Sequence, residues 1–545
     1  MAPIKSCFHY LSALTLLLAF IPRISTAIIL SRDLKATIHN ALEHEYTMRT
    51  PGYGLQVKIA ESSALIDSIA AVDDATPVSK RATAACRVAE IIFPGRVFAA
   101  NSSEYQAEQE YNWSQTCWLP AACFIRPQSA VDVAAALKII RHTGTKFAVR
   151  TGGHNPNSGF GSIDGSGVLL DLRDLDFLSL DDDATLQAGP GNTWGKVYDF
   201  LDPHGRSAIG GRHYTVGLPG FLLGGGMTFF PNLYGLGIDS VKNFEVVLSD
   251  SRIVNANADE NPDLFQALKG GGPNFGIVTR FDIETHPLHN VQYSLNLYDP
   301  SDYKAILEAT TQVQHAMESD SKIGLFLNVN PTVIIAGLLY ADWPAEPPKA
   351  FTPFANLKSF WGHFIPPMNG TIASLTSSIN IGDYPAKREP YAVSTEVDHG
   401  LYVQVHEKYL GLLKTANMPS ANLSYTIQPV SRGAVEASKE RGSSSLGLKP
   451  VSQTWWAPLV EWFDDSDDEA AHKALNSLGT GVQCLAEDGG KLIEYQFMND
   501  ASYTQTVLES YGEENLKRLK AVQQKFDPES FFQKFQGDGF LLRKL

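Results

Sequence analysis

The stretch Arg150-Thr151-Gly152-Gly153-His154 follows a short apolar run, Phe-Ala-Val at 147–149, in the first third of this 545-residue chain. The apolar run predicts a buried strand, and the paired glycines predict a tight turn directly after it. Glycine lets backbone N–H groups approach an anion closely and allows positive φ angles. The stretch therefore predicts a strand-to-loop turn that holds an anionic or flat ligand against the backbone.

Further glycine clusters follow before residue 277. They are Gly189-Pro190-Gly191, then Gly217 with Gly220 and Gly224-Gly225-Gly226, and finally Gly270-Gly271-Gly272 with Gly276. Any one cluster is typical of an ordinary turn. Four in succession favour a pyrophosphate or a ring system lying across the backbone.

Three other classes of enzyme lack their motifs in this sequence: dinucleotide-binding enzymes of the Rossmann type, serine hydrolases and zinc proteases. Gly189, Gly191 and Gly195 have one residue too many for the G-x-G-x-x-G dinucleotide motif, and no acidic residue stands near position 210 to hold a ribose. The chain also has no G-x-S-x-G elbow and no H-E-x-x-H helix. We interpret His286 and His289 as part of a loop between domains, and expect no metal site.

Periodicity predicts an α+β chain in three parts. In the first part we expect a helix capped by Ser129 and running to His142, a helix at 262–268, strands at 168–172, 184–188 and 277–284, and a hairpin of 242–248 with 252–256. After Pro287 we expect an antiparallel sheet with strands at 323–329, 333–339, 402–405 and 452–460, and helices at 305–317 and 469–478. Trp455, Trp456 and Trp462 are expected to pack this sheet, with substrate stacking by Trp456 and Trp462 as the alternative. Two helical segments near the C-terminus are expected to fold back onto the first part.

The N-terminus resembles a secretory leader. Lys5 precedes an apolar run at 11–21, and Ser25-Thr26-Ala27 follows it, so residues 1–27 are predicted to be a signal peptide and 28–84 an arm or linker with a helix at 29–48. No later apolar run approaches the length of a membrane span, so no stable membrane anchor is expected. The 44 basic and 59 acidic residues give a net charge of −15 without a basic stripe, which argues against a nucleic-acid partner.

In a secreted protein, cysteines can form disulfides and Asn-X-Ser/Thr sequons can be glycosylated. Cys86, Cys117, Cys123 and Cys484 permit three pairings, and a bridge from Cys86 to Cys117 or Cys123 would be local. Glycosylation is predicted at the Asn-X-Ser/Thr sequons Asn101, Asn112, Asn369 and Asn422.

The ordered set of motifs resembles berberine bridge enzyme-like flavoproteins, which have the vanillyl-alcohol oxidase (PCMH) type of FAD-binding fold. Residues 150–154 match the R-S-G-G-H loop of that family, although the closing Gly159 comes one residue late. The likeness continues through residues 215–217, 234–239 and 272–279, and returns at 497–501 and 511–528. It implies an FAD domain from 85–288 completed by 490–545, with a substrate domain at 289–489.

The resemblance also implies a set of site residues. His154 would bond covalently to the flavin, and the loops around it would hold FAD and its pyrophosphate. The implied cofactor-binding residues are Arg150, Thr151, Gly152, Gly153, Asn155, Ser158, Gly159, Val216, Gly217, Gly220, Gly224, Gly225, Asp239, Gly276, Ile277, Val278 and Asn499.

The chain departs from the family at two positions. Many relatives carry a second flavin link through cysteine, but His213 stands there, which favours a single attachment and argues against a sugar oxidase. Asp500 replaces the tyrosine that serves as base in several members, so Asp500 is either the catalytic base or a residue that orders its loop. Val216 matches the position that gates O₂ access, where valine accompanies oxidases.

These observations predict a secreted, monomeric FAD-linked oxidase of fungal type that uses O₂ on a small organic substrate of secondary metabolism. An oxidative cyclase and a carbohydrate oxidase are the alternatives, and a fold kept for binding without turnover is a third. Oxygen consumption discriminates oxidation from binding alone.

Overall fold

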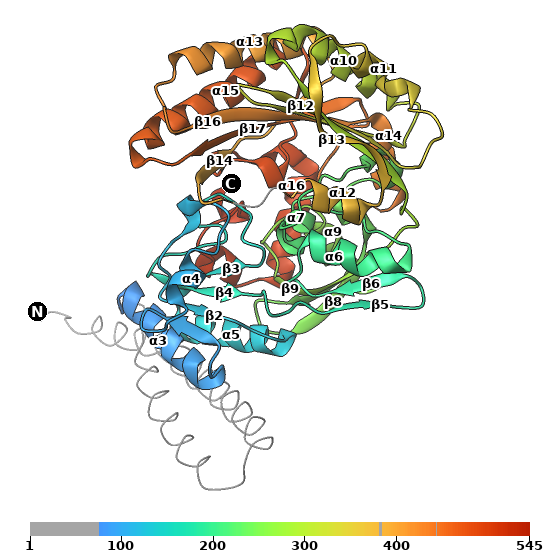
Figure 1. The fold of residues 1–545 in the computed structure, drawn as a ribbon. Coiled ribbons are helices and arrows are strands. Elements are labelled where there is room, and N and C mark those ends of the chain that lie inside the picture. Colours follow the sequence, from blue (N-terminus) through green and yellow to red (C-terminus); the bar gives the residue numbers. More distant parts are fainter. Residues whose placement is uncertain (1–75, 381–383, 443) are drawn as a thin grey trace, which may run out of the picture.

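The computed structural model describes residues 76–380, 384–442 and 444–545. The predicted leader, the helix at 29–48 and most of the arm lie outside these residues. Figure 1 shows a lower part with two small sheets and an upper part with one large sheet under a layer of helices. The predicted α+β fold with an antiparallel sheet is confirmed.

The first sheet has the order β1 (Val97–Ala99), β2 (Cys123–Ile125), β4 (Gly167–Asp171) and β3 (Lys146–Arg150). Strands β2, β4 and β3 are parallel, and helix α5 (Ala130–Thr143) provides the crossover between β2 and β3. As predicted, Ser129 caps α5, where its hydroxyl accepts a hydrogen bond from the Asp132 amide. Gly144 ends the helix in the left-handed conformation.

Helix α3 (Val78–Ile92) corrects the predicted boundary of the arm at residue 84. Its buried side chains, among them Ala82 and Ala85, begin before that boundary, and the helix packs against α5. A disulfide between Cys86 and Cys123 joins α3 to β2. Of the two local pairings left open by the sequence, the chain therefore adopts the one with Cys123.

The second sheet has the order β5 (Leu178–Leu180), β6 (Thr185–Ala188), β9 (Ile277–Glu284), β7 (Val241–Val247) and β8 (Ile253–Asn257). All its neighbours are antiparallel, and β7 and β8 form the predicted hairpin. The loops and helices between these strands face the large sheet. They include α6 (Trp194–Leu201), α7 (Leu218–Leu223), α8 (Pro231–Tyr234) and α9 (Pro262–Leu268). Helix α4 (Tyr105–Gln109) belongs to the first sheet, where it contacts β1 and β2.

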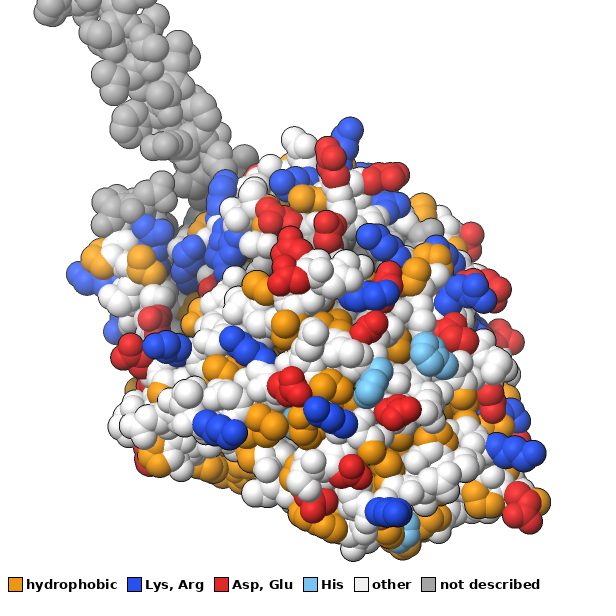
Figure 2. All heavy atoms as spheres, turned by 90° about the horizontal axis from the view of Figure 1, so that it is seen from above, with side chains coloured by type: hydrophobic (Ala, Val, Ile, Leu, Met, Phe, Trp, Pro, Cys, Tyr) orange, Lys and Arg blue, Asp and Glu red, His pale blue; other side chains and the backbone are white. Residues whose placement is uncertain are grey.

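The large sheet is built after residue 288. Its order is β13 (Phe360–Gly370), β10 (Val291–Tyr298), β12 (Ile334–Tyr340), β11 (Ile323–Val329), β16 (Asn422–Val430), β17 (Gln453–Trp462), β15 (Val393–Glu396) and β18 (Leu492–Ile493), and β14 (Lys387–Pro390) also pairs with β17. Helices α10 (Tyr303–Ala316), α13 (His399–Thr415) and α15 (Asp468–Asp488) cover its outer face in Figure 1, and shorter helices are α11 (Thr352–Ala355), α12 (Ile372–Ser378) and α14 (Arg432–Glu440). On the face shown in Figure 2, basic and acidic side chains are interspersed.

The strand predicted at 402–405 is wrong, because these residues lie in α13. Asp398 caps the helix through the Leu401 amide, and Tyr402, Val405 and Tyr409 are buried at helical spacing. Trp456 and Trp462 point into the same helix-covered core, and Trp455 packs on Tyr495 and Phe497. None of the three tryptophans lines the cavity described below, so the substrate-stacking alternative is wrong.

The C-terminal segment returns to the lower part, as predicted. Helix α16 (Glu513–Phe526) packs on α9, and Phe531 and Phe532 of α17 (Phe531–Phe535) are buried against the first sheet. A bridge between Phe147 and Gln536 adds this segment beside β3. The return places residues 497–500 beside loops that precede them by almost 300 positions.

Candidate active site

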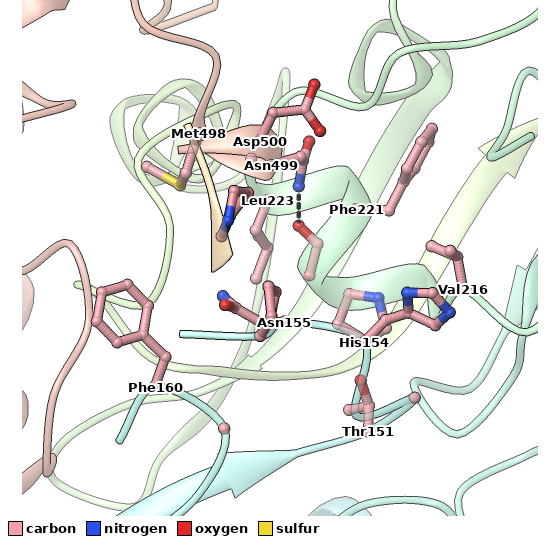
Figure 3. Close-up of a pocket in the computed structure, with 18 of the residues that line it drawn as sticks. Thr151, His154, Asn155, Phe160, Val216, Phe221, Leu223, Met498, Asn499 and Asp500 are labelled. Atoms are coloured by element: carbon pink, nitrogen blue, oxygen red, sulfur yellow. Dashed lines mark hydrogen bonds between the residues drawn. The ribbon is translucent and has the colours of Figure 1, made fainter. Parts of the chain in front are cut away.

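A cavity of about 500 Å³ lies between the lower loops and the inner face of the large sheet. Its volume is within the roughly 300–1,000 Å³ range of ligand sites. Figure 3 shows Thr151 and His154 on one side of it and Asn499 and Asp500 on the other. Residues far apart in the sequence therefore enclose one site.

Two glycine loops form one wall by direct backbone contact. A Cβ atom on Gly152 would lie 2.6 Å from the Gly217 nitrogen, and one on Gly217 would lie 2.8 Å from the Gly152 nitrogen. Gly153 has a φ of 67°, which favours glycine. The motif at 150–154 is thus required for the loops to approach each other, and both loops line the cavity.

His154 is held from two directions. Its Nε2 lies 2.9 Å from the Thr215 hydroxyl, which also lies 3.0 Å from Nδ1 of His213. The Trp113 ring stacks on the imidazole with centroids 4.7 Å apart. These contacts fix the position and tilt of the ring at the cavity wall.

Asn499 joins the C-terminal segment to helix α7. Its Nδ2 donates to the Gly220 carbonyl at 2.8 Å, and its Oδ1 accepts from the Gly226 amide at 3.1 Å. A Cβ on Gly224 would lie 2.5 Å from the Asn499 amide nitrogen. These contacts hold the C-terminal segment against the loop that contains helix α7, beside the cavity.

Asp500, Gln428 and Arg212 form a hydrogen-bonded chain at the opposite wall. Gln428 donates from Nε2 to Asp500 Oδ2 at 2.6 Å and accepts from the Arg212 guanidinium. Burial raises the pKa of Asp500, and the Gln428 hydrogen bond and the Arg212 charge lower it in part. The net pKa lies above the ordinary aspartate value, which suits a base working nearer neutral pH.

Most of the predicted site residues line this cavity. They are Arg150, Thr151, Gly152, Gly153, His154, Asn155, Val216, Gly217, Gly220, Gly224, Gly276, Ile277, Val278, Asn499 and Asp500. Figure 3 shows Val216 beside His154, at one end of the cavity.

Four predicted residues lie outside the lining: Ser158, Gly159, Gly225 and Asp239. Asp239 is buried and accepts a hydrogen bond from the Leu236 amide at 2.7 Å, so it stabilises its own turn. Gly159 makes a local contact to the Ser162 hydroxyl, and Ser158 is exposed. This end of the loop therefore lies outside the cavity lining.

Arg150 lines the cavity, but its charged group is bound within the fold. Its guanidinium is buried and binds Asp171 Oδ2 and Glu108 Oε2, each at 2.8 Å or less. These ion pairs occupy its guanidinium, and the role in holding the pyrophosphate that the resemblance implies for Arg150 stays a prediction. The cluster at 189–191 is also structural, because these glycines pack against the backbone of residues 172–175.

The roof of the cavity was not predicted from the sequence. Strand β16 presents Ser424, Thr426 and Gln428 to it, and Asn328 of β11 donates to the Thr426 hydroxyl at 3.0 Å. The signal that could have found it is the two-residue alternation of polar side chains along β16. Trp113 and Arg212 were missed as well.

The predicted glycosylation sites differ in exposure. Asn101 and Asn369 are exposed, and Asn422 is half-buried. Asn112 is buried, and its Nδ2 donates to the carbonyls of Cys117 and Gly161. A glycan on that nitrogen is incompatible with this fold, so the prediction for Asn112 is wrong.

Within the described ranges, no group of three or more His, Cys, Asp or Glu side chains has the arrangement of a metal site. His286 stacks on Tyr234 at 4.0 Å, and burial lowers its pKa to about 4. Within the same ranges, no helix has the length and apolar character that crossing a bilayer requires.

Comparison with known proteins relates this geometry to flavoenzymes. An FAD binding domain family matches residues 121–257. An FAD-dependent monooxygenase of Arthrobotrys oligospora is 37% identical over 467 residues, covering 84% of this chain and 89% of the relative. The FAD-dependent monooxygenase macF of Penicillium terrestre is 33% identical over 83% of this chain and 88% of its own. The bifunctional solanapyrone synthase of Alternaria solani is 30% identical over 82% and 86% of the two chains.

Solved structures share the fold at low identity. The 6-hydroxy-D-nicotine oxidase of Arthrobacter nicotinovorans superposes with a TM-score of 0.68 at 22% identity, covering 82% of this chain and 98% of that one. A glucooligosaccharide oxidase of Acremonium strictum gives a TM-score of 0.69 at 19% identity, with coverages of 84% and 98%. A BBE-like protein of Physcomitrella patens gives a TM-score of 0.69 at 17% identity, covering 84% of this chain and 99% of that one, so the fold is that of the berberine bridge enzyme-like flavoproteins. The chain belongs to the family of the fungal FAD-dependent monooxygenases, and it carries their FAD-binding domain.

Proposed function

We propose that the chain binds FAD covalently through His154 and uses O₂ to oxidise a small organic substrate of secondary metabolism. The proposal rests on one observation: His154 and Asp500 line the same cavity from opposite sides. The named activities of the fungal relatives support the flavin chemistry.

The cavity wall fits a flat ring system approached by backbone. Gly152 and Gly217 remove side chains from one wall, and a Cβ on Gly220 would meet no atom within 4 Å. The residues that would hold FAD include His154, Thr151, Val216 and Asn499. The chemistry that FAD supplies when bound is hydride acceptance from a substrate carbon and electron transfer to O₂.

Two residues of the chain have roles in that reaction. Asp500 accepts the substrate proton, since its raised pKa and its Gln428 contact poise the carboxylate at the cavity wall. Val216 lies beside His154 and limits the space through which O₂ reaches the reacting edge. Asp500 and Val216 therefore have different roles: Asp500 removes the substrate proton, and Val216 controls the access of O₂.

A substrate screen by peroxide release tests the proposal. With the right substrate, anaerobic mixing bleaches the flavin absorbance, and air then yields one peroxide per product. No bleaching with any of the compounds that bind would contradict oxidation and favour a binding role. Covalent attachment is measured separately, by the fluorescence of the denatured protein.

Monooxygenation is the second candidate, favoured by the names of the relatives. It inserts oxygen from ¹⁸O₂ into the product and releases less than one peroxide per turnover, so mass spectrometry separates it from oxidation. Ring closure is a variant suggested by the solanapyrone synthase relative, and product structure reveals it. A carbohydrate substrate is less favoured, because none of the residues that 289–489 contribute to the described lining is aromatic.

We also propose that the protein is a glycosylated monomer of the secretory route. The Cys86–Cys123 disulfide supports this, since such bonds persist in oxidising compartments. The exposed sequons at Asn101 and Asn369 support it too. Expression in a secreting host, with N-terminal sequencing, glycosidase treatment and gel filtration of the medium fraction, tests the three parts separately.

A further inference from the structure

We infer that Arg212 and Asp500 form a binding site for the acidic hydroxyl of a phenol or enol, with Gln428 holding the two groups apart. The inference rests on the proposed function and names the substrate class of that same cavity. This wall holds a cation and a carboxylate that are joined through an amide and are not paired directly.

Arg212 is the cation of the site. It lines the cavity, and among the described residues its one hydrogen bond to protein is the contact to Gln428 Oε1. No carboxylate of those residues lies within 4.0 Å of the guanidinium. A guanidinium has five N–H donors, so most of them remain for a ligand.

Burial affects the two charged groups in opposite directions. It lowers the pKa of Arg212 and raises that of Asp500, and the attraction between them counteracts both shifts. A desolvated guanidinium is costly unless an acceptor reaches it. A ligand oxygen that becomes negative beside Arg212 would supply that acceptor and strengthen the contact.

Gln428 sets the geometry. The residue is 2% exposed and its amide is used at both ends, so its amide lies between Asp500 and Arg212, and all three residues line the cavity. A ligand hydroxyl in the cavity that reaches both charged groups would find an acceptor in Asp500 and a donor in Arg212. The O–H bond breaks, the proton moves to an Asp500 oxygen, and the electron pair stays on the substrate oxygen facing Arg212. No redox change occurs in this step.

The acidity of the hydroxyl selects the substrate class. A phenol has a pKa of about 10, and the enol of a dicarbonyl is more acidic. A carboxyl of raised pKa accepts the proton of such a hydroxyl more readily than an ordinary aspartate does, and a nearby cation stabilises the oxyanion that remains. Alkyl and sugar hydroxyls are far weaker acids. The neutral groups of Ser424, Thr426 and Asn328 on the same roof suit the further oxygens of such a ring.

The test is a ligand titration without turnover. FAD-loaded protein is titrated anaerobically with 4-cyanophenol and with its methyl ether, 4-methoxybenzonitrile, and the dissociation constant is read from the change in flavin absorbance. We expect the wild type to bind the phenol at least tenfold more tightly than the ether. Arg212→Gln should lose that preference, and Arg212→Lys should keep part of it, because charge remains but the planar fork is lost.

Arg252→Gln is the matched control, since it removes the same charge from an exposed side chain. It should bind both probes like the wild type. Equal binding of phenol and ether by the wild type, or an unchanged preference in Arg212→Gln, would overturn the inference. Flavin content, measured on each variant, and peroxide release in the substrate screen report separately on the proposed function.

Discussion

The indole of Trp113 stacks on the imidazole of His154, with ring centroids 4.7 Å apart and planes 18° apart. The Arg388 guanidinium lies 4.1 Å from the Trp113 ring centroid and donates to the Trp113 carbonyl. Arg388 is in turn fixed by Glu461 at 2.7 Å. A column of side chains therefore connects the large sheet to the residue that we propose as the flavin attachment point.

Trp113→Ala should lower the fraction of protein with covalent flavin, because His154 loses the aromatic face that fixes its tilt. Trp113→Phe should retain most of it. The fluorescence of acid-denatured protein in a gel, divided by protein stain, measures the fraction. Equal covalent fractions in both variants and the wild type would show that stacking does not position His154.

Val216→Leu should slow the reaction of the reduced cofactor with O₂. The added methylene fills space beside His154 in a close-packed wall. Stopped-flow mixing with oxygenated buffer measures this step, and anaerobic mixing with substrate measures the reductive step, which should change little. An unaltered rate with O₂ contradicts the gate.

Asp500→Asn should slow flavin reduction by substrate at least about a hundredfold while flavin content stays the same, since a general base typically supplies 10²–10⁴-fold. In the wild type this rate should rise with pH through the raised pKa of Asp500, because the ionised carboxylate is the active form. Arg212→Gln should move that midpoint to higher pH, since it removes the charge that lowers the Asp500 pKa. A rate within about threefold of the wild type would exclude Asp500 as the base.

Gly152→Ala should destabilise the fold and reduce flavin incorporation, because the new methyl would lie 2.6 Å from the Gly217 nitrogen. Gly411→Ala is the control: that glycine lies in α13, where an added methyl would meet no atom within 4 Å, so the change should stabilise the helix by about 0.5–1 kcal/mol. Thermal unfolding followed by circular dichroism distinguishes them. A melting temperature for Gly152→Ala equal to that of the wild type would show that the loops can separate without cost.

Local patterns in the sequence predicted much of the lower part. Helix α9 begins at Pro262, and β9 ends at Glu284, where the apolar pattern placed them. The segment at 402–405 failed because its Tyr and Val favour a strand in isolation, whereas the cap at Asp398 and contacts with the core select a helix.

The site was predictable where one motif supplies it, as at 150–154. Thr426, Gln428 and Arg212 were not, because they meet only when the sheet closes over the loops. Asp239 is the opposite case, because its motif placed it at the site but its carboxylate accepts a hydrogen bond from its own turn. Whether a carboxylate faces a cavity or its own turn depends on packing that a short motif does not encode.

Mass spectrometry of tryptic peptides tests the central claim, the attachment of FAD at His154, most directly. Cleavage after Arg150 and Arg173 isolates His154 in peptide 151–173, and cleavage after Arg212 and Lys242 isolates His213 in peptide 213–242. The account predicts that acid-precipitated protein stays yellow, that the flavin mass is found on peptide 151–173 alone, and that His154→Ala releases it while His213→Ala does not. A colourless pellet from the unmodified protein, or flavin on peptide 213–242, would contradict it.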